Sequence, residues 1–61
     1  MKMRLIRMLN SALQAEERRL LAARSDAARA MKAQVCGRLN EKISEVREEI
    51  ARRRKAGEFW P

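Results

Sequence analysis

The stretch that decides the fold is CGRLNEKISEVREEI, residues 36–50. Its apolar side chains recur at alternating intervals of three and four residues, which is the spacing of one face of an α-helix. Repeated in this way, the pattern is typical of a coiled-coil seam, where two positions per heptad face a neighbouring helix. Charged residues occupy the rest of the circumference, so the apolar stripe is narrow. We therefore predict that a seam between two helices or two chains is formed by Cys36, Leu39, Ile43, Val46 and Ile50.

Signals at both ends of the stripe bound a helix over about residues 40–56. Asn40 is a residue type that caps helix N-termini, because its side-chain oxygen accepts a hydrogen bond from an exposed backbone N–H. The basic run at residues 52–55 matches the negative end of a helix dipole. Gly57 suits the residue after a helix, where a positive φ is common. A short aromatic tail follows at residues 57–61.

A second apolar stripe precedes the first and predicts a helix over about residues 3–35. It runs from Ile6 to Ala30 with the same average spacing, but its register does not continue into residues 36–50. The S-x-x-Q pattern of Ser11 and Gln14 is that of a capping box and leaves open a start near residue 12. Gly37 is the only glycine before the tail, so we place a break near residues 36–39. The expected fold is all-α: one small domain formed by a two-helix antiparallel hairpin with unequal arms and a coiled-coil-like seam.

Unequal arms would leave the amino-terminal part of the longer helix uncovered. At 1.5 Å per residue, helices of about 32 and about 17 residues span roughly 48 and 26 Å. The uncovered part is rich in apolar residues, and exposed apolar patches usually mark an interface. Phe59 and Trp60 lie beyond the second helix, either as a lid over it or as anchors in a partner's pocket. The expected partner-binding residues are Leu5, Ile6, Leu9, Leu13, Phe59 and Trp60.

The size of the chain favours association. Its 61 residues contain one cysteine and no histidine, so an internal disulfide is excluded and a zinc site has almost no ligands. Small domains without such links usually rely on well-packed helices or on oligomerisation. We therefore expect a homo-oligomer or a chain docked on a larger partner, with no metal and no cofactor. Without histidine or tyrosine, and without a concave pocket in a hairpin, we expect no catalytic residues and no enzyme activity.

The charge of the chain indicates the kind of partner. Fifteen Lys and Arg residues against eight Asp and Glu give a formal net charge of +7, which favours association with anionic surfaces. The function predicted first is that of a small basic protein–protein interaction module. It would act as an accessory subunit, adaptor or inhibitor by laying helix faces into a groove of an acidic partner.

The alternative function is nucleic-acid binding. MKMRL and GRLNEKISEV resemble the basic strand and the second helix of ribbon-helix-helix repressors. That resemblance implies that the first segment pairs as a strand across a dimer and reads the major groove. A basic ribonucleoprotein subunit is a second form of this alternative. The contacts expected in either case are Lys2, Arg4, Arg52, Arg53, Arg54 and Lys55.

The arginine run also has a purely structural interpretation. It can be the solvated end of a helix, paired with acidic residues one turn earlier, as in Glu48–Arg52 and Glu49–Arg53. The first segment, MKMRLIRMLNSAL, also suits a helix lying on an anionic membrane surface, although we consider membrane binding the weaker interpretation. No stretch approaches the ~20 apolar residues of a membrane-spanning helix. A lone cysteine suits a reducing compartment, so a cytoplasmic location is expected.

Overall fold

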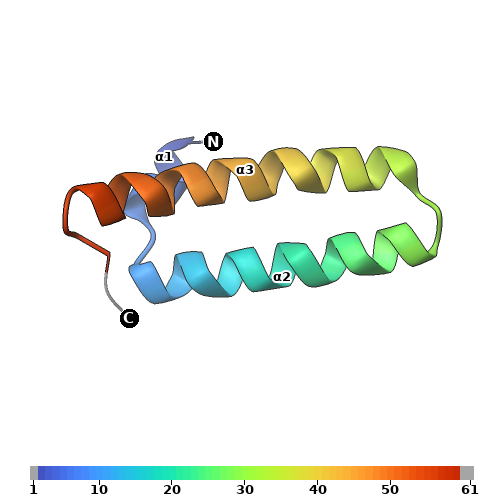
Figure 1. Ribbon diagram of the computed structural model, residues 1–61, viewed down its shortest axis with the longest axis horizontal. Helices are drawn as coiled ribbons and strands as arrows, with labels where there is room; N and C mark the ends of the chain where they lie inside the picture. Colours follow the sequence, from blue (N-terminus) through green and yellow to red (C-terminus); the bar gives the residue numbers. More distant parts are fainter. Residues whose placement is uncertain (1, 60–61) are drawn as a thin grey trace.

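The computed structural model describes the backbone of residues 2–59 and the side chains of residues 5–59. It contains three helices, α1 (Lys2–Arg7), α2 (Asn10–Arg29) and α3 (Ala33–Lys55). The two long helices α2 and α3 lie antiparallel and side by side, and α1 packs against α3 near its carboxyl end (Figure 1). There is no strand between residues 2 and 59. The predicted all-α hairpin is therefore confirmed, and the segment that resembled a repressor strand is helical.

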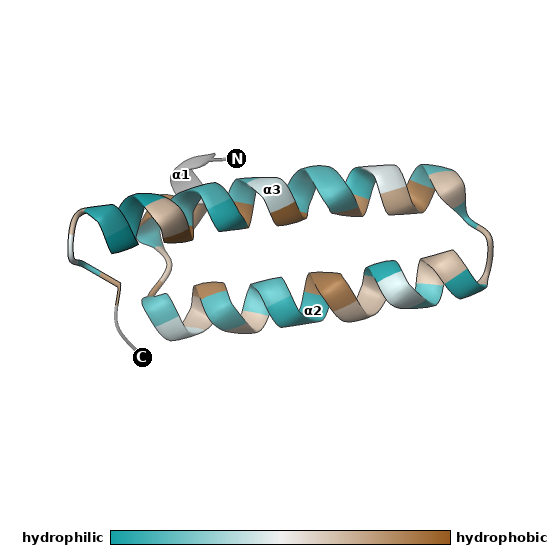
Figure 2. Ribbon diagram, viewed as in Figure 1, coloured by the Kyte–Doolittle hydropathy of each residue, from teal (hydrophilic) through white to brown (hydrophobic). Residues whose placement is uncertain are grey.

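The core of the hairpin is a single seam between α2 and α3. The apolar residues of both helices lie mainly on the sides that face each other (Figure 2). Leu5 of α1 joins them, and four apolar side chains pack against this core while remaining half-buried: Met8, Leu21, Leu39 and Phe59. The buried apolar residues are Leu5, Leu13, Leu20, Ala27, Ile43, Val46 and Ile50.

The break between the long helices lies at residues 30–32, so the predicted break near residues 36–39 is wrong. Gly37 lies inside α3, and a Cβ atom added at this residue would have no neighbour within 4 Å. Asn40 is likewise in the helix interior and does not cap it. Its side-chain oxygen instead accepts a hydrogen bond of 2.9 Å from Arg24 across the seam.

Backbone hydrogen bonds explain how the chain turns without a glycine. The Lys32 N–H donates to the Ala27 carbonyl at 2.9 Å, and the Met31 N–H donates to the Ala28 carbonyl at 3.1 Å. This pair of bonds is a Schellman motif, which ends a helix by placing one residue in the left-handed region. Met31 takes that position with φ 57°. The motif normally favours glycine, which is why the sequence did not reveal the turn.

The arms of the hairpin are therefore nearly equal, with 20 residues in α2 and 23 in α3. The amino-terminal segment does not extend the first arm. The chain leaves the helical conformation at Met8 and Leu9, and Leu9 is extended, with φ −67° and ψ 156°. The predicted helix over residues 3–35 is thus divided into two helices, and α1 covers part of the hairpin.

The carboxyl end of α3 follows the prediction. Gly57 has φ 73°, and the Glu58 N–H donates to the Arg53 carbonyl at 2.7 Å. The Gly57 N–H donates to the Arg54 carbonyl at 3.1 Å. These bonds form a second Schellman motif, here with the expected glycine in the left-handed position. The basic residues at 52–55 occupy the last turn, as the helix dipole favours.

Candidate functional site

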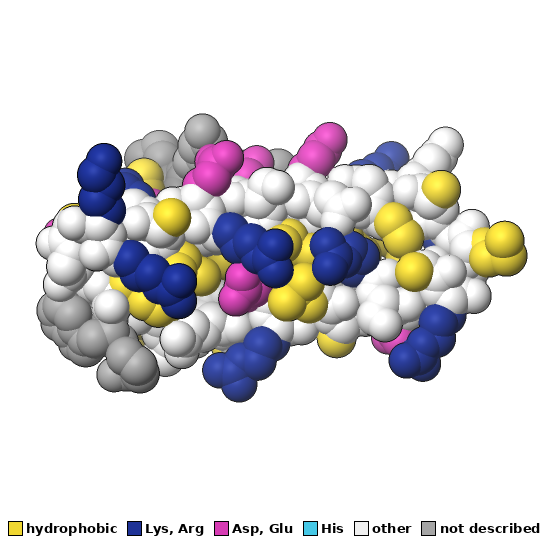
Figure 3. Space-filling model, viewed as in Figure 1, with side chains coloured by type: hydrophobic (Ala, Val, Ile, Leu, Met, Phe, Trp, Pro, Cys, Tyr) yellow, Lys and Arg dark blue, Asp and Glu magenta, His cyan; other side chains and the backbone are white. Residues whose placement is uncertain are grey.

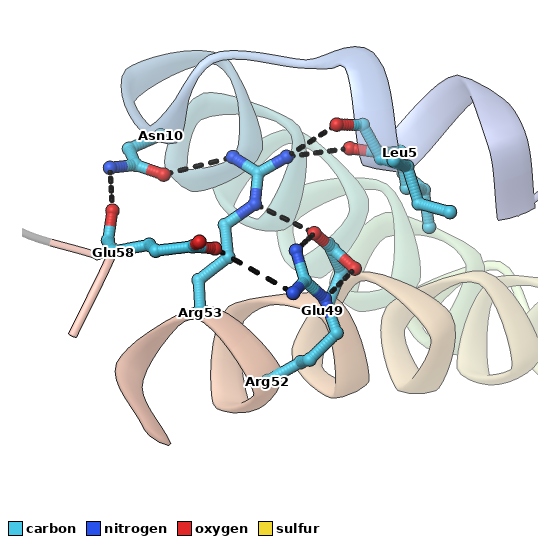
Figure 4. Close-up of polar contacts among 7 residues, drawn as sticks. Leu5, Asn10, Glu49, Arg52, Arg53 and Glu58 are labelled. Atoms are coloured by element: carbon cyan, nitrogen blue, oxygen red, sulfur yellow. Dashed lines mark hydrogen bonds and ion pairs between the residues drawn. The ribbon is translucent and has the colours of Figure 1, made fainter. Parts of the chain in front are cut away.

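Arg53 is the centre of a polar network at the open end of the hairpin (Figure 4). Its side chain comes from the last turn of α3, yet the residue is only 7% exposed. One terminal nitrogen donates to the carbonyl oxygens of Leu5 and Ile6, both at 3.0 Å. The other donates to the side-chain oxygen of Asn10 at 2.8 Å. Arg53 therefore binds the last carbonyls of α1 and the first residue of α2 at once.

Glu49 lies one turn before Arg53 and supplies the negative charge of the network. Its carboxylate accepts hydrogen bonds from Nε of Arg53 at 2.7 Å and from Arg52 at 2.9 and 3.0 Å. The Arg52 hydrogen bonds are the largest influence on its pKa, and those from Arg53 act in the same direction. Together they outweigh desolvation and lower the pKa of Glu49 from 4.5 to about 2. Glu49 is thus held as an anion between two guanidinium groups.

Arg52 and Arg54, like Arg53, contact other groups of the same chain. Arg52 pairs with Glu49 and lies 3.6 Å from the carboxylate of Glu58. The guanidinium of Arg54 lies over the ring of Phe59, 5.3 Å from its centre. Of the two predicted ion pairs, Glu49–Arg53 is present, whereas Arg52 pairs with Glu49 instead of Glu48. These contacts favour the structural interpretation of the basic run, in which the arginines bind groups of their own chain, over an interpretation in which they are free to bind phosphates.

The predicted outward apolar surface is wrong for two of its four aliphatic residues. Leu5 of α1 is buried against the core of the hairpin, and Leu13 is fully buried in the seam. Ile6 and Leu9 are exposed as predicted, at 57% and 75%. Phe59 is half-buried against the core, which fits the lid alternative. Trp60 and the side chains of Lys2 and Arg4 lie outside the described residues.

The predicted seam residues do come together, but within one chain. Ile43, Val46 and Ile50 are buried against α2, and Leu39 is half-buried beside them. Cys36 is also half-buried, with its sulfur 3.9 Å from the carbonyl oxygen of Arg24. The seam therefore holds the two arms of the hairpin together.

Two shallow grooves follow the seam, one on each side. On the α1 side, the groove is lined by three apolar residues and by two acidic and two basic ones, so its charges balance. These residues are Leu5, Leu20, Val46, Glu16, Glu45, Arg19 and Lys42. The groove on the other side is lined by Glu17, Arg47, Ile50, Ala51 and Arg54. There, Lys and Arg side chains lie along the middle of the face with apolar side chains between them (Figure 3).

Sequence reasoning missed the central role of Arg53 and its contact with Asn10. A signal for Arg53 was present, because the residue stands seven positions after Val46 and so continues the seam. An arginine at a seam position must be paired and hydrogen-bonded when it is buried. Every buried polar side-chain atom between residues 5 and 59 does have such a partner.

Comparison with protein-family models, with curated protein sequences and with solved structures finds no significant match to this chain. In the part of the chain that the structure describes, no three Cys, Asp or Glu side chains gather into a group that could hold a metal ion. No helix in that same part has the length and apolar character needed to cross a membrane.

Proposed function

We propose that this protein is a helical protein–protein interaction module that acts by covering or bridging the surface of a partner. The observation that carries the proposal is the surplus of surface in the hairpin. A compact protein of 7.1 kDa exposes about 4,100 Å², whereas this chain exposes 4868 Å². The surface is thus about a fifth larger than that of a compact protein of the same mass, which leaves more of the chain available for contact with a partner.

The shape of the molecule accounts for this surplus. The structure measures 39 × 20 × 17 Å, and its radius of gyration is 12.5 Å, whereas a compact domain of this length has about 10.5 Å. Two helices have only one seam to bury, so the remaining faces stay in water. Ile6 and Leu9 add large exposed apolar side chains near the open end of the hairpin. They are the residues we place in the interface, with a second copy or another protein as partner.

Two measurements test this proposal. Sedimentation equilibrium over a wide range of protein concentration measures self-association, and chemical unfolding measures the stability of the chain. We expect either concentration-dependent self-association or a single chain of low stability, with a free energy of unfolding below the ordinary ~5 kcal/mol. Replacing both Ile6 and Leu9 by serine should weaken self-association without loss of helicity. Val35→Ser, at an exposed apolar residue near the hairpin turn, is the matched control.

The opposite result would overturn the proposal. A chain that sediments at its own mass at every concentration, and that unfolds cooperatively with a stability ordinary for an independent domain, has no need of a partner. Unchanged self-association in the Ile6→Ser/Leu9→Ser variant would overturn the placement of the interface.

A further inference from the structure

Three arginines are spaced evenly along the face of the hairpin away from α1. Arg47 and Arg54 are seven residues apart in α3, so they lie on the same side of the helix and about 10.5 Å apart along its axis. Asn40 stands another seven residues earlier and accepts a hydrogen bond from Arg24 of α2. Arg24 therefore lies near the third position of the same row. We call Arg24, Arg47 and Arg54 the arginine face.

The positive charge of the arginine face is only partly neutralised. Arg24 bonds to a neutral amide, and Arg54 lies over a neutral aromatic ring. Arg47 pairs with Glu17 at 2.9 Å, but its side chain remains 56% exposed. Such an exposed pair contributes little to stability, so a second carboxylate can compete for Arg47.

The surface between the arginines is partly apolar. Exposed Ala51 and the edge of buried Ile50 line the groove between Arg47 and Arg54, together with the Glu17 carboxylate that pairs with Arg47. Leu21 of α2 is half-buried and packs against the core. A ligand of this face must therefore combine apolar groups in the middle with negative charges at intervals of about 10.5 Å. An amphipathic helix with acidic residues every seven positions has this spacing, because its own rise per residue is the same as that of α3.

Two other occupants fit less well. A second copy of the chain would bring its own arginines against these, and like charges across an interface are destabilising. Single-stranded nucleic acid is usually bound by a basic groove together with aromatic side chains on which bases stack. Phe59 is the aromatic residue that the structure describes here, and Arg54 already covers its ring.

We propose that the arginine face binds an acidic amphipathic helix of a partner protein. The helix packs along the groove between α2 and α3 and places carboxylates opposite Arg24, Arg47 and Arg54. Its apolar side chains cover Ala51 and Leu21, so that the complex is a three-helix bundle. This inference rests on the proposed function as an interaction module and adds a second surface, separate from Ile6 and Leu9, together with the chemistry of its partner.

A pair of synthetic helical peptides tests the inference by fluorescence anisotropy. The first peptide carries leucine at the seam positions and glutamate at seven-residue intervals beside them, and the second replaces these glutamates by lysine. We expect the full-length protein to bind the glutamate peptide and not the lysine peptide. The double variant Arg47→Glu/Arg54→Glu should bind the glutamate peptide about tenfold more weakly or worse. Lys42→Glu/Arg38→Glu makes the same change in net charge elsewhere on α3 and should keep most of the affinity.

Two outcomes would overturn the inference. Equal loss of affinity in the two double variants would mean that overall charge, and not the arginine face, attracts the peptide. A mixed-sequence DNA duplex that binds more tightly than the peptide at physiological salt, and that loses this binding in Arg47→Glu/Arg54→Glu, would assign the face to nucleic acid. The proposed function is judged separately by sedimentation of the protein without peptide.

Discussion

The guanidinium of Arg53 donates a hydrogen bond of 3.0 Å to the carbonyl oxygen of Leu5, 48 residues earlier in the chain. The Leu5 carbonyl also accepts from the Met8 N–H at 3.1 Å, and the same guanidinium nitrogen donates to the Ile6 carbonyl near the end of α1, where helical partners run out. Since the same guanidinium also binds Asn10 and Glu49, one side chain connects all three helices. Several expected properties of the protein depend on this contact or on the packing beside it.

Arg53→Ala should be the most damaging change in the basic run. It leaves Glu49 buried without one of its two cations, and removing one partner of a buried pair typically costs about 3–5 kcal/mol. Urea denaturation followed by circular dichroism would measure the loss. Lys55→Ala, an exposed neighbour, should change the stability by less than about 0.5 kcal/mol. Similar losses for the two variants would contradict the buried role of Arg53.

Stability should depend on pH through Glu49. Its pKa in the folded protein is about 2, below its ordinary value of 4.5, so the folded state binds the proton less readily than the unfolded state. The ionised carboxylate therefore stabilises the fold above pH 4.5, and this contribution is lost as the pH falls towards 2. The loss should be on the order of 2 kcal/mol. Urea denaturation at a series of pH values would measure it.

Substitution of Glu49 separates its effect from those of other carboxylates. Glu49→Gln should lower the stability at neutral pH and flatten its fall below pH 4.5. Glu48→Gln changes an exposed neighbour and should leave the fall in place. A curve of unchanged steepness in Glu49→Gln would show that other groups cause the acid dependence.

Met31→Gly should stabilise the protein although it deletes a large side chain. Met31 is 91% exposed, so little packing is lost, and its φ of 57° is one that glycine adopts without steric cost. We expect a gain of about 0.5–1 kcal/mol, measured by thermal unfolding. Gly57→Ala is the reciprocal change at the other Schellman motif and should cost about 1 kcal/mol. Destabilisation by Met31→Gly would mean that the side chain has a contact beyond this hairpin.

Gly37→Ala should also stabilise the protein, for a different reason. Gly37 lies inside α3 with a helical backbone, and an added Cβ would meet nothing within 4 Å. Alanine in a helix interior is favoured over glycine by about 0.5–1 kcal/mol. The melting temperature should rise by several degrees. A fall would indicate that the chain bends or is contacted at this residue.

Leu13→Ala and Leu9→Ala compare the same chemical change in two environments. Leu13 is fully buried, and its truncation should cost about 2–5 kcal/mol of stability. Leu9 is mostly exposed, so its truncation should leave the stability almost unchanged and weaken only association. Urea denaturation at low protein concentration measures the first effect. Equal losses for the two variants would indicate that the amino-terminal segment packs differently from this structure.

The parts of the fold that sequence reasoning predicted are those with a strong local signal. The spacing of Ile43, Val46 and Ile50 predicted the seam, and Gly57 predicted the end of α3. Both signals are properties of a few neighbouring residues. The turn at Met31 had no such signal, because its backbone bonds could form with an unfavoured residue in the left-handed position. Gly37 was given too much weight, since an isolated glycine is tolerated inside a helix at a cost of about 1 kcal/mol.

The candidate site was less predictable because it depends on contacts that are distant in sequence. Leu5 and Leu13 were assigned outward because a single long first helix would have left them uncovered. The break at Met8 allows α1 to fold back, and Leu5 then reaches the core. Arg53 can reach the carbonyls of Leu5 and Ile6 only because α1 ends and folds back at this point. Arg53 was predicted as a phosphate contact or as part of a solvated helix end, although its seam position was a signal for burial, and its partners depend on the folded arrangement of three helices.

The separation between Leu5 and Arg53 has a consequence for the order in which the molecule assembles. Contacts near the turn at residues 30–32 close short loops, which form quickly, whereas the Arg53 network closes a loop of nearly the whole chain and is entropically more costly. Folding should therefore begin at the turn and proceed along the paired helices, and docking of α1 should come last. On this view α1 is also the first segment to detach in local opening, and its departure would uncover Leu5 and its contacts for short intervals without unfolding the hairpin.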